Sequence, residues 1–180
     1  MGRDSSLRIS NRCPLKHLAT MAQTRGIWLI LRAVRRLWRT SDLDDSFRAE
    51  WDGSTDKYPV LHYGDARPSA AGPYCVFETG DPIVLTHQTG HTNDEEIQTL
   101  QVPLQFRIHA KSDATEDGKD KCIRLAMAIR AVFNSPARLD IKPDSHIDTT
   151  VEADFHIREG DDEWMWVVPY TLLIDACFDL

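Results

Sequence analysis

The sequence predicts an α+β domain in which an antiparallel sheet of about four to five strands carries two amphipathic helices on one face. Two observations lead to this fold class. Apolar residues recur three and four positions apart in two separate segments, as in helices, and alternate with polar residues in segments that follow each of them. The resulting order of helix, two or three strands, helix and two strands is typical of an antiparallel sheet with both helices on the same face.

Composition and charge limit the classes of function. The 180 residues are enough for one domain with its own core, and 42% hydrophobic with 27% charged residues is an ordinary globular composition. The net charge of -7 argues against a general affinity for DNA, because phosphate binding requires a basic surface. No apolar stretch approaches the ~20 residues of a membrane span. We therefore expect no specific nucleic-acid partner and no membrane partner.

The N-terminal residues and the cysteines indicate the setting of the domain. Residues 1–21 contain scattered basic residues and no continuous apolar run, so we expect a flexible N-terminal tail, followed by a single domain over residues 22–180. The four cysteines form no CxxC pair. We expect them to be reduced, as in a cytoplasmic protein.

The first helix is predicted between Ile27 and Trp38. Its apolar residues recur at spacings of three and four, and they are Ile27, Ile30, Leu31, Val34, Leu37 and Trp38. The other side carries four basic residues, which are Arg32, Arg35, Arg36 and Arg39. Such a helix usually covers a sheet, but a basic amphipathic helix can also bind an anionic membrane surface or a partner protein.

The segment from residue 42 to residue 96 predicts a connector, short strands and a loop. The connector runs from Asp42 to Lys57 and has room for one short turn of helix. Short strands are predicted over Tyr58–Tyr63, Tyr74–Glu78 and Ile83–Thr86, the last two bounded by glycine and proline. The polar segment His87–Glu96 predicts a solvated hairpin loop.

The clearest strand is predicted from Leu100 to His109, where apolar and polar residues alternate. This pattern places one side of the strand on the core and the other in water. Pro103 removes a backbone donor from the strand, so we expect it at a sheet edge or a bulge, where that amide would have pointed outward.

A second helix and a C-terminal hairpin complete the domain. Apolar spacing marks a helix over Cys122–Phe133, and the spacing of Asp113 and Glu116 predicts a capping box before it. Alternation over Val151–Ile157 and Trp164–Ile174, on either side of an acidic turn, predicts the hairpin.

No sequence motif predicts catalysis, since nucleophile-elbow, zinc-protease, phosphate-loop and dinucleotide patterns are missing. His87 and His91 have a spacing that suits zinc on a helix, but they lie in a predicted loop. The acidic run over residues 113–120 lacks the ligand alternation of a calcium loop. Trp164 and Trp166 share one strand face, which favours core burial or a protein interface over a stacking platform for bases or sugars. We expect no enzyme, no metal and no cofactor.

Three segments carry a resemblance to a known family. They are Gly72–Phe77 (GPYCVF), Leu100–Ala110 (LQVPLQFRIHA) and Glu163–Ile174 (EWMWVVPYTLLI). Together with the order of the elements they resemble the tail-terminator, or tail-completion, proteins of long-tailed phages, in which a strand of the first kind follows a loop, a long alternating strand leads into an amphipathic helix, and a similar strand closes the fold. The resemblance spans roughly Ile27–Ile174, while the connector Asp42–Lys57 departs from it.

The resemblance implies a structural protein of a phage or prophage that forms a ring, typically a hexamer, on the end of the tail tube. Such a ring stops tail polymerisation and joins the tail to the head. The implied partners are further copies of the chain, the tail-tube protein and a head-completion or connector protein. The implied location is the virion tail, after assembly in the host cytoplasm.

Two sets of residues are candidate sites in such a ring. Exposed strand edges beside a polar loop are suitable material for a contact between subunits. The candidate interface residues are His87, Gln88, His91, Asn93, Asp94, Glu95 and Pro103. The basic side of the first helix, with Arg32, Arg35, Arg36 and Arg39, is a candidate for the inner side of the ring near exiting DNA, or is simply a solvated face.

Two other classes of function stay open. A ligand-binding or regulatory α+β module predicts a deep apolar pocket with a few convergent polar groups. A hydrolase or metalloenzyme would use His87, His91 and His109. The fold alone does not decide among these classes, because one scaffold hosts unrelated functions.

Overall fold

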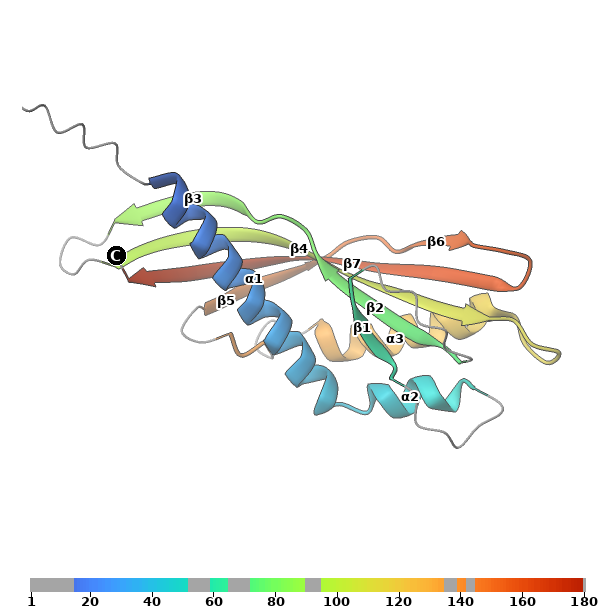
Figure 1. Cartoon of the computed structure of the whole chain (residues 1–180). Coiled ribbons are helices and arrows are strands. Elements are labelled where there is room, and N and C mark those ends of the chain that lie inside the picture. The colour runs from blue at the N-terminus through green and yellow to red at the C-terminus, as the bar shows by residue number, and fades with distance from the viewer. Residues whose placement is uncertain are drawn as a thin grey trace, which may run out of the picture.

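The computed structural model describes residues 15–51, 59–64, 72–89, 95–134, 139–141 and 145–179 (Figure 1). Within these ranges the chain forms three helices and seven strands. The helices are α1 (Leu15–Arg39), α2 (Leu43–Ala49) and α3 (Gly118–Phe133). The strands are β1 (Leu61–Tyr63), β2 (Tyr74–Thr79), β3 (Ile83–Thr89), β4 (Glu95–Lys111), β5 (Ser145–Val151), β6 (Phe155–Arg158) and β7 (Glu163–Asp179). The predicted α+β class is confirmed.

Two long strands form the centre of the sheet. β4 and β7 have 17 residues each and pair antiparallel from end to end, with Glu95 opposite Asp179 and Lys111 opposite Glu163. On the outer side of β4 lie β2 and β3, at different ends of that strand. On the outer side of β7 lie β5 and β6, again at different ends. Figure 1 shows β3 and β6 at opposite ends of the central pair.

The predicted sheet needs two corrections. The described part of the sheet has seven strands rather than four to five, because β5 has no apolar alternation to reveal it and because the predicted strand Val151–Ile157 is divided between β5 and β6. The sheet is also mixed, since β1 pairs parallel with β2 while the other described pairs are antiparallel. Whether two consecutive strands pair parallel or antiparallel depends on the path of the chain that connects them, and local sequence pattern does not encode that path.

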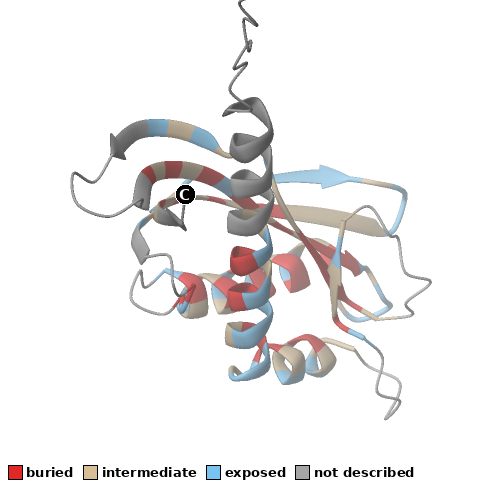
Figure 2. Ribbon diagram, turned by 60° about the vertical axis from the view of Figure 1, so that its left-hand side comes forward, coloured by how far each residue is buried: buried red, intermediate tan, exposed pale blue. Residues whose placement is uncertain are grey.

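The core lies between the helices and one face of the sheet. Phe106 of β4 is fully buried, and its ring lies 6.3 Å from that of Trp38 in α1 and 4.7 Å from that of Phe133 in α3. Trp38 in turn contacts Phe47 of α2, with ring centroids 5.5 Å apart. All three helices therefore belong to the layer on the Phe106 side, which confirms the one-face prediction and adds α2 to it. Figure 2 shows buried residues on the helices and on the central strands.

The described part of α1 has the predicted amphipathic character. Ile30, Ala33, Val34 and Trp38 are buried, whereas Arg32, Arg35, Arg36 and Arg39 are exposed. The helix begins at Leu15, well before the predicted start at Ile27. Among the described residues, no helix combines the length and the apolar character that crossing a membrane requires.

The start of α3 differs from the predicted capping box. The N-cap is Asp117, whose side chain accepts a hydrogen bond from the Lys119 amide at 3.0 Å. Asp113 instead closes the preceding turn, because its carboxylate accepts the amides of Thr115 and Glu116. An aspartate side chain can accept backbone amides either in a turn or at a helix start, so the spacing of Asp113 and Glu116 did not reveal which of the two aspartates caps α3.

Pro103 lies on a central strand, so the prediction of a sheet edge is wrong. The outward backbone position that the prediction required is nevertheless present, because β2 ends opposite Leu104 and β3 begins opposite Gln101. Pro103 faces the break between these two strands, where its carbonyl accepts the Gly80 amide at 3.0 Å. A missing donor has no consequence where no strand is present to receive it.

Candidate interaction surface

The sheet face opposite Phe106, here called the open face, lies away from the layer formed by the three described helices. Its members follow from the register, because directly opposed residues project from the same side of a sheet. On β4 the open face carries Gln101, Pro103, Gln105, Arg107 and His109, and on β7 it carries Met165, Val167, Pro169, Thr171 and Leu173.

Large apolar side chains are exposed on the flanks of the open face. Ile83 of β3 stands opposite Gln101 and is 55% exposed. Phe155 and Ile157 of β6 stand opposite Val167 and Met165 and are 49% and 46% exposed. Phe155 and Ile157 lie two residues apart on this face, while Ile83 lies about six residues along β4 from them; neighbouring exposed apolar residues such as Phe155 and Ile157 are typical of a surface that another protein covers.

A groove crosses the middle of the open face where both flanking strands are interrupted. Its volume is about 520 Å³, and its lining consists of Glu78, Thr79, Gly80, Pro103, Leu104, Gln105, Glu152, Ala153, Phe155, Pro169 and Tyr170. The two prolines occupy equivalent places on β4 and β7. Proline has no backbone N–H to donate, so neither Pro103 nor Pro169 needs a neighbouring strand to accept a hydrogen bond from it. The gap between the flanking strands can therefore stay open as a groove.

Acidic residues lie on both sides of this groove, and both are engaged. The Glu78 carboxylate accepts a hydrogen bond from the Arg107 guanidinium at 2.9 Å and another from the side-chain amide of Gln105. Glu152 accepts the Thr171 hydroxyl at 2.6 Å. These contacts fix the side chains at the groove and leave it with a polar border around an apolar centre.

The candidate interface residues from the sequence are only partly placed. His87, Gln88 and Glu95 belong to paired strands, with His87 opposite Gln98, so the predicted loop His87–Glu96 is shorter than expected. Both sides of this segment carry polar residues, so it lacks the alternation of apolar and polar residues from which a strand is predicted. Their side chains, and His91, Asn93 and Asp94 as a whole, lie outside what the structure describes. Pro103 lies in the groove, and the interface role of the set stays a prediction.

The four arginines of α1 share an exposed side of the helix, as predicted, but their environments differ. Arg36 forms an ion pair with Asp140 at 2.8 Å. Arg32 lies over the Trp28 ring at 5.5 Å, and Arg35 lies over the Phe77 ring at 5.9 Å. Part of this basic face therefore contacts groups of the chain itself, and its place inside a ring stays a prediction.

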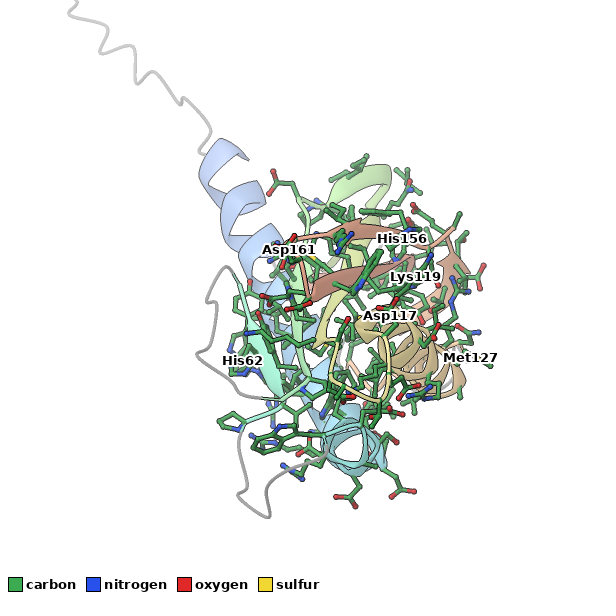
Figure 3. The ribbon with its side chains drawn as sticks, turned by 90° about the vertical axis from the view of Figure 1, so that its right-hand side faces the viewer. His62, Asp117, Lys119, Met127, His156 and Asp161 are labelled. Atoms are coloured by element: carbon green, nitrogen blue, oxygen red, sulfur yellow. The ribbon has the colours of Figure 1, made fainter. Side chains whose placement is uncertain are left out.

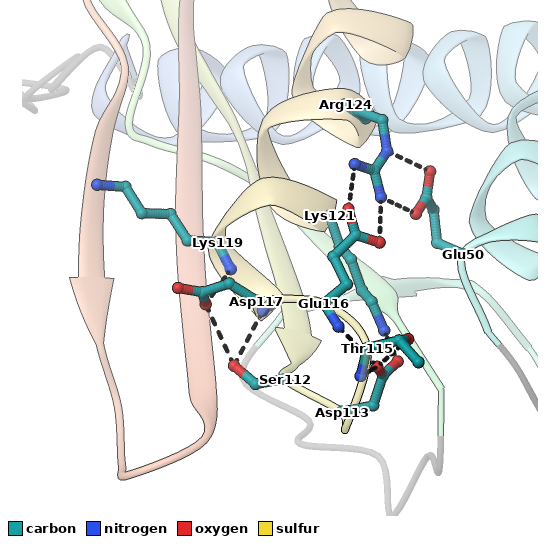
Figure 4. Close-up of polar contacts among 10 residues, drawn as sticks. Glu50, Ser112, Asp113, Thr115, Glu116, Asp117, Lys119, Lys121 and Arg124 are labelled. Carbon is teal, nitrogen blue, oxygen red and sulfur yellow. Dashed lines mark hydrogen bonds and ion pairs between the residues drawn. The ribbon is translucent and has the colours of Figure 1, made fainter.

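The acidic run before α3 is a structural clamp (Figure 4). Arg124 joins Glu50 after α2 to Glu116, with distances of 2.8 Å and 2.7 Å. Lys121 forms an ion pair with Asp113. These contacts hold the pKa of the Asp113 carboxyl far below its usual range, chiefly through Lys121, and lower the pKa of Glu116, chiefly through Arg124. The two carboxylates are committed to cationic partners, as expected for a helix start rather than a calcium loop.

The tryptophan pair at the start of β7 is partly buried against the core. Trp166 stacks on His156 of β6 at 5.2 Å and donates its indole hydrogen to Asp154 at 3.1 Å. Trp164 lies near two cations, Lys119 at 5.6 Å and Arg158 at 5.8 Å. Figure 3 labels Lys119 of α3 and His156 of β6, which make two of these contacts. Contacts within the chain occupy these rings, in agreement with packing rather than base stacking.

His109 is the only one of the three histidines of the metalloenzyme alternative whose side chain the structure describes. It is 5% exposed, stacks on Tyr74 with centroids 4.6 Å apart, and lies with Nδ1 3.1 Å from a carboxylate oxygen of Glu159. Burial lowers the pKa of its imidazole, while Glu159 opposes that shift. No sequence pattern marks Glu159 or Glu163 as neighbours of His109, because both belong to a turn 50 or more positions away.

Comparison with known proteins gives a structural likeness only. No protein-family model and no curated protein matches the chain. Among solved structures, a chain described as "Virion of native gene transfer agent (GTA) particle" matches with a TM-score of 0.51 and 12% sequence identity. The match covers 83% of this chain and 98% of that chain. At this identity the likeness establishes a shared fold.

Proposed function

We propose that the protein is a structural component of a phage-like virion that forms a ring on the end of a tail tube, ends tail polymerisation and joins the tail to the head. The observation that carries the proposal is the shared fold with a chain of a gene transfer agent virion, which extends over 98% of that chain. The order of elements and the three sequence segments that resemble tail terminators support the same class.

The surface of the sheet is suited to assembly. In the described part of the chain, β3, β5 and β6 each pair with a single strand, so each leaves one edge for a neighbour. The open face adds Ile83, Phe155 and Ile157 as exposed apolar contacts. A ring requires two different surfaces that join head to tail around a closed circle, and edges on opposite sides of one sheet meet that requirement.

The proposed partners are further copies of the chain, the tail-tube protein and a head-completion or connector protein. The net charge of -7 favours encounter with basic patches on these partners, since charge mainly affects association rate. In this proposal the basic side of α1 lines the ring near exiting DNA. The protein performs no catalysis in this role, and its location is the virion tail after assembly in the host cytoplasm.

The proline-lined groove favours a second candidate, a ligand-binding module. A groove of about 520 Å³ with an apolar centre and a few polar residues at its border has the size and the character of a small-molecule or peptide site. This candidate predicts a stable monomer that gains stability from a bound ligand, whereas the ring proposal predicts self-association.

Light scattering coupled to size-exclusion chromatography tests the ring proposal, over a concentration series and with the tail-tube protein encoded beside this gene where one exists. We expect a closed oligomer, alone or on tubes, that Phe155→Glu disrupts and that Met127→Glu leaves intact. Both side chains are exposed, but Met127 lies on α3, away from the open face. A strict monomer under every condition would contradict the ring and favour the ligand-binding module.

A further inference from the structure

Three side chains with metal-binding atoms meet at one end of the open face. They are His109 of β4, Glu159 in the turn after β6, and Glu163 at the first position of β7. One ligand atom from each lies within 4.8 Å of the ligand atoms of the other two. In the described part of the chain, this is the one group of three or more such residues with that spacing.

Regular structure holds these residues in place. His109 pairs with Met165 of β7 on one side and with Tyr74 of β2 on the other, and its ring lies flat against the Tyr74 ring at an angle of 7°. The Glu159 amide donates to the Glu163 carbonyl at 2.9 Å, which closes the turn that carries both carboxylates. The imidazole therefore has one wall of aromatic carbon and faces the two carboxylates.

The site is buried on the imidazole side and partly buried on the carboxylate side. The His109 side chain is 6% exposed and that of Glu159 is 16% exposed. Two cations lie nearby: the Arg107 guanidinium, which forms an ion pair with Glu78 at 2.9 Å, and Lys111, which stands opposite Glu163. Two carboxylates beside a buried imidazole are a charge distribution that a divalent cation would balance.

The donor set indicates the class of cation. One imidazole nitrogen with two carboxylate oxygens is a set that zinc and its neighbouring transition metals accept, whereas magnesium and calcium prefer oxygen ligands alone. Three protein ligands leave at least one coordination position for water or another donor. The ligand atoms are close enough that side-chain rotation, without movement of the strands, would bring them to a common ion.

We propose that His109, Glu159 and Glu163 form a site for one divalent transition-metal ion, with zinc as the best-suited member of the class. The bound ion ties the β6–β7 turn to β4, and so fixes the end of the open face that carries Phe155 and Ile157. The proposal departs from the expectation of no metal that the sequence supported, and it does not depend on the ring.

Calorimetric titration of the full chain, stripped of metal with a chelator, tests the site. We expect one equivalent of zinc to bind, and Glu163→Gln and Glu159→Gln to weaken that binding roughly tenfold or more. His156→Gln is the matched control, because it removes an exposed histidine from the neighbouring strand β6 and should leave zinc binding unchanged. Circular dichroism establishes that each variant is folded.

Two further readouts separate this site from adventitious binding. At one fixed zinc concentration, zinc should raise the melting temperature of the unmodified protein and of His156→Gln by more than that of Glu163→Gln. Magnesium, titrated under the same conditions, should bind more weakly than zinc. The proposal is overturned by absence of zinc binding, by equal zinc affinity in the glutamate variants, or by magnesium that binds as tightly as zinc.

Discussion

Pro103 of β4 and Pro169 of β7 are diagonal neighbours at the centre of the sheet, and each marks the place where its flanking strand stops. Pro103 stands opposite Thr171, and Pro169 stands opposite Gln105. The Pro103 carbonyl accepts the Gly80 amide at 3.0 Å, and the Pro169 carbonyl accepts the Glu152 amide at 3.2 Å. Both sides of the central pair are therefore interrupted at the same level, which creates the groove.

Replacement of Pro103 by alanine should have a small effect on stability. No flanking strand stands ready to receive the amide that alanine restores, so the folded protein gains no ladder bond. Alanine gives the unfolded chain more conformational freedom than proline. We therefore expect the free energy of unfolding to fall by about 0.4–1 kcal/mol. Urea denaturation followed by circular dichroism measures it.

Gln105 provides the matched contrast for Pro103. Gln105 lies on the same side of β4 but stands opposite Glu78 of β2, so its amide belongs to the ladder. Gln105→Pro should lower the free energy of unfolding by at least ~1–3 kcal/mol more than Gln105→Ala, because a carbonyl of β2 loses its donor. Equal stability of these two variants would contradict the placement of the strand break at Pro103.

The sequence predicted those parts of the fold that depend on local pattern. Alternation from Leu100 to His109 revealed the buried side of β4, and apolar spacing revealed the buried sides of α1 and α3. β5, with the sequence SHIDTTV, has no such alternation, so its strand forms through pairing with β7. The parallel pairing of β1 is likewise a matter of chain path rather than of composition.

The candidate sites depend still more on contacts between distant segments. Phe155 and Ile157 alternate as core residues would, yet β6 exposes them, because α3 covers the other side of β7. Glu159 and Glu163 appear in the sequence as parts of an acidic turn. Only the register of β4 on β7 brings Glu163 to the end of the sheet where His109 lies.

Trp38 should contribute more to stability than any exposed aromatic residue. Its side chain is 1% exposed, contacts Phe47 and Phe106, and donates its indole hydrogen to Asp44 at 2.6 Å. Trp38→Ala should therefore lower the free energy of unfolding by about 3–5 kcal/mol. Urea denaturation followed by circular dichroism measures the loss without relying on tryptophan fluorescence. Trp28→Ala, at a 56% exposed position of the same helix, should change it by less than ~0.5 kcal/mol.

Cys122 should make stability depend on pH in the alkaline range. Burial raises the pKa of its thiol to about 12, against about 8.5 in an unfolded chain. Below pH ~8.5 both states keep the proton and the contribution is constant. As pH rises above that value, the unfolded thiol ionises first, so stability falls by up to about 1.4 kcal/mol per pH unit.

Guanidinium unfolding of the unmodified protein and of Cys122→Ala between pH 7 and pH 10 isolates this effect. The stability difference between them should shrink as pH rises, since the alanine variant lacks the ionising group. Alkylation offers a second measure, because a buried thiol with this pKa should react roughly a thousandfold more slowly at pH 8 than an unfolded one. Rapid labelling of Cys122 in the folded protein would contradict its burial.

Gly118 at the start of α3 should not tolerate even a methyl group. A Cβ at this position would lie 2.8 Å from the Ala110 carbonyl oxygen and 2.8 Å from the Ser112 nitrogen, both of which are backbone atoms. Alanine is a better helix former than glycine by about 1 kcal/mol, but the close approach of α3 to the end of β4 outweighs that gain. We expect Gly118→Ala to lower the free energy of unfolding by about 1–3 kcal/mol. Gly160→Ala, where a Cβ would meet nothing within 4 Å, should be nearly neutral, and thermal denaturation of the two variants side by side distinguishes steric exclusion from a general need for glycine.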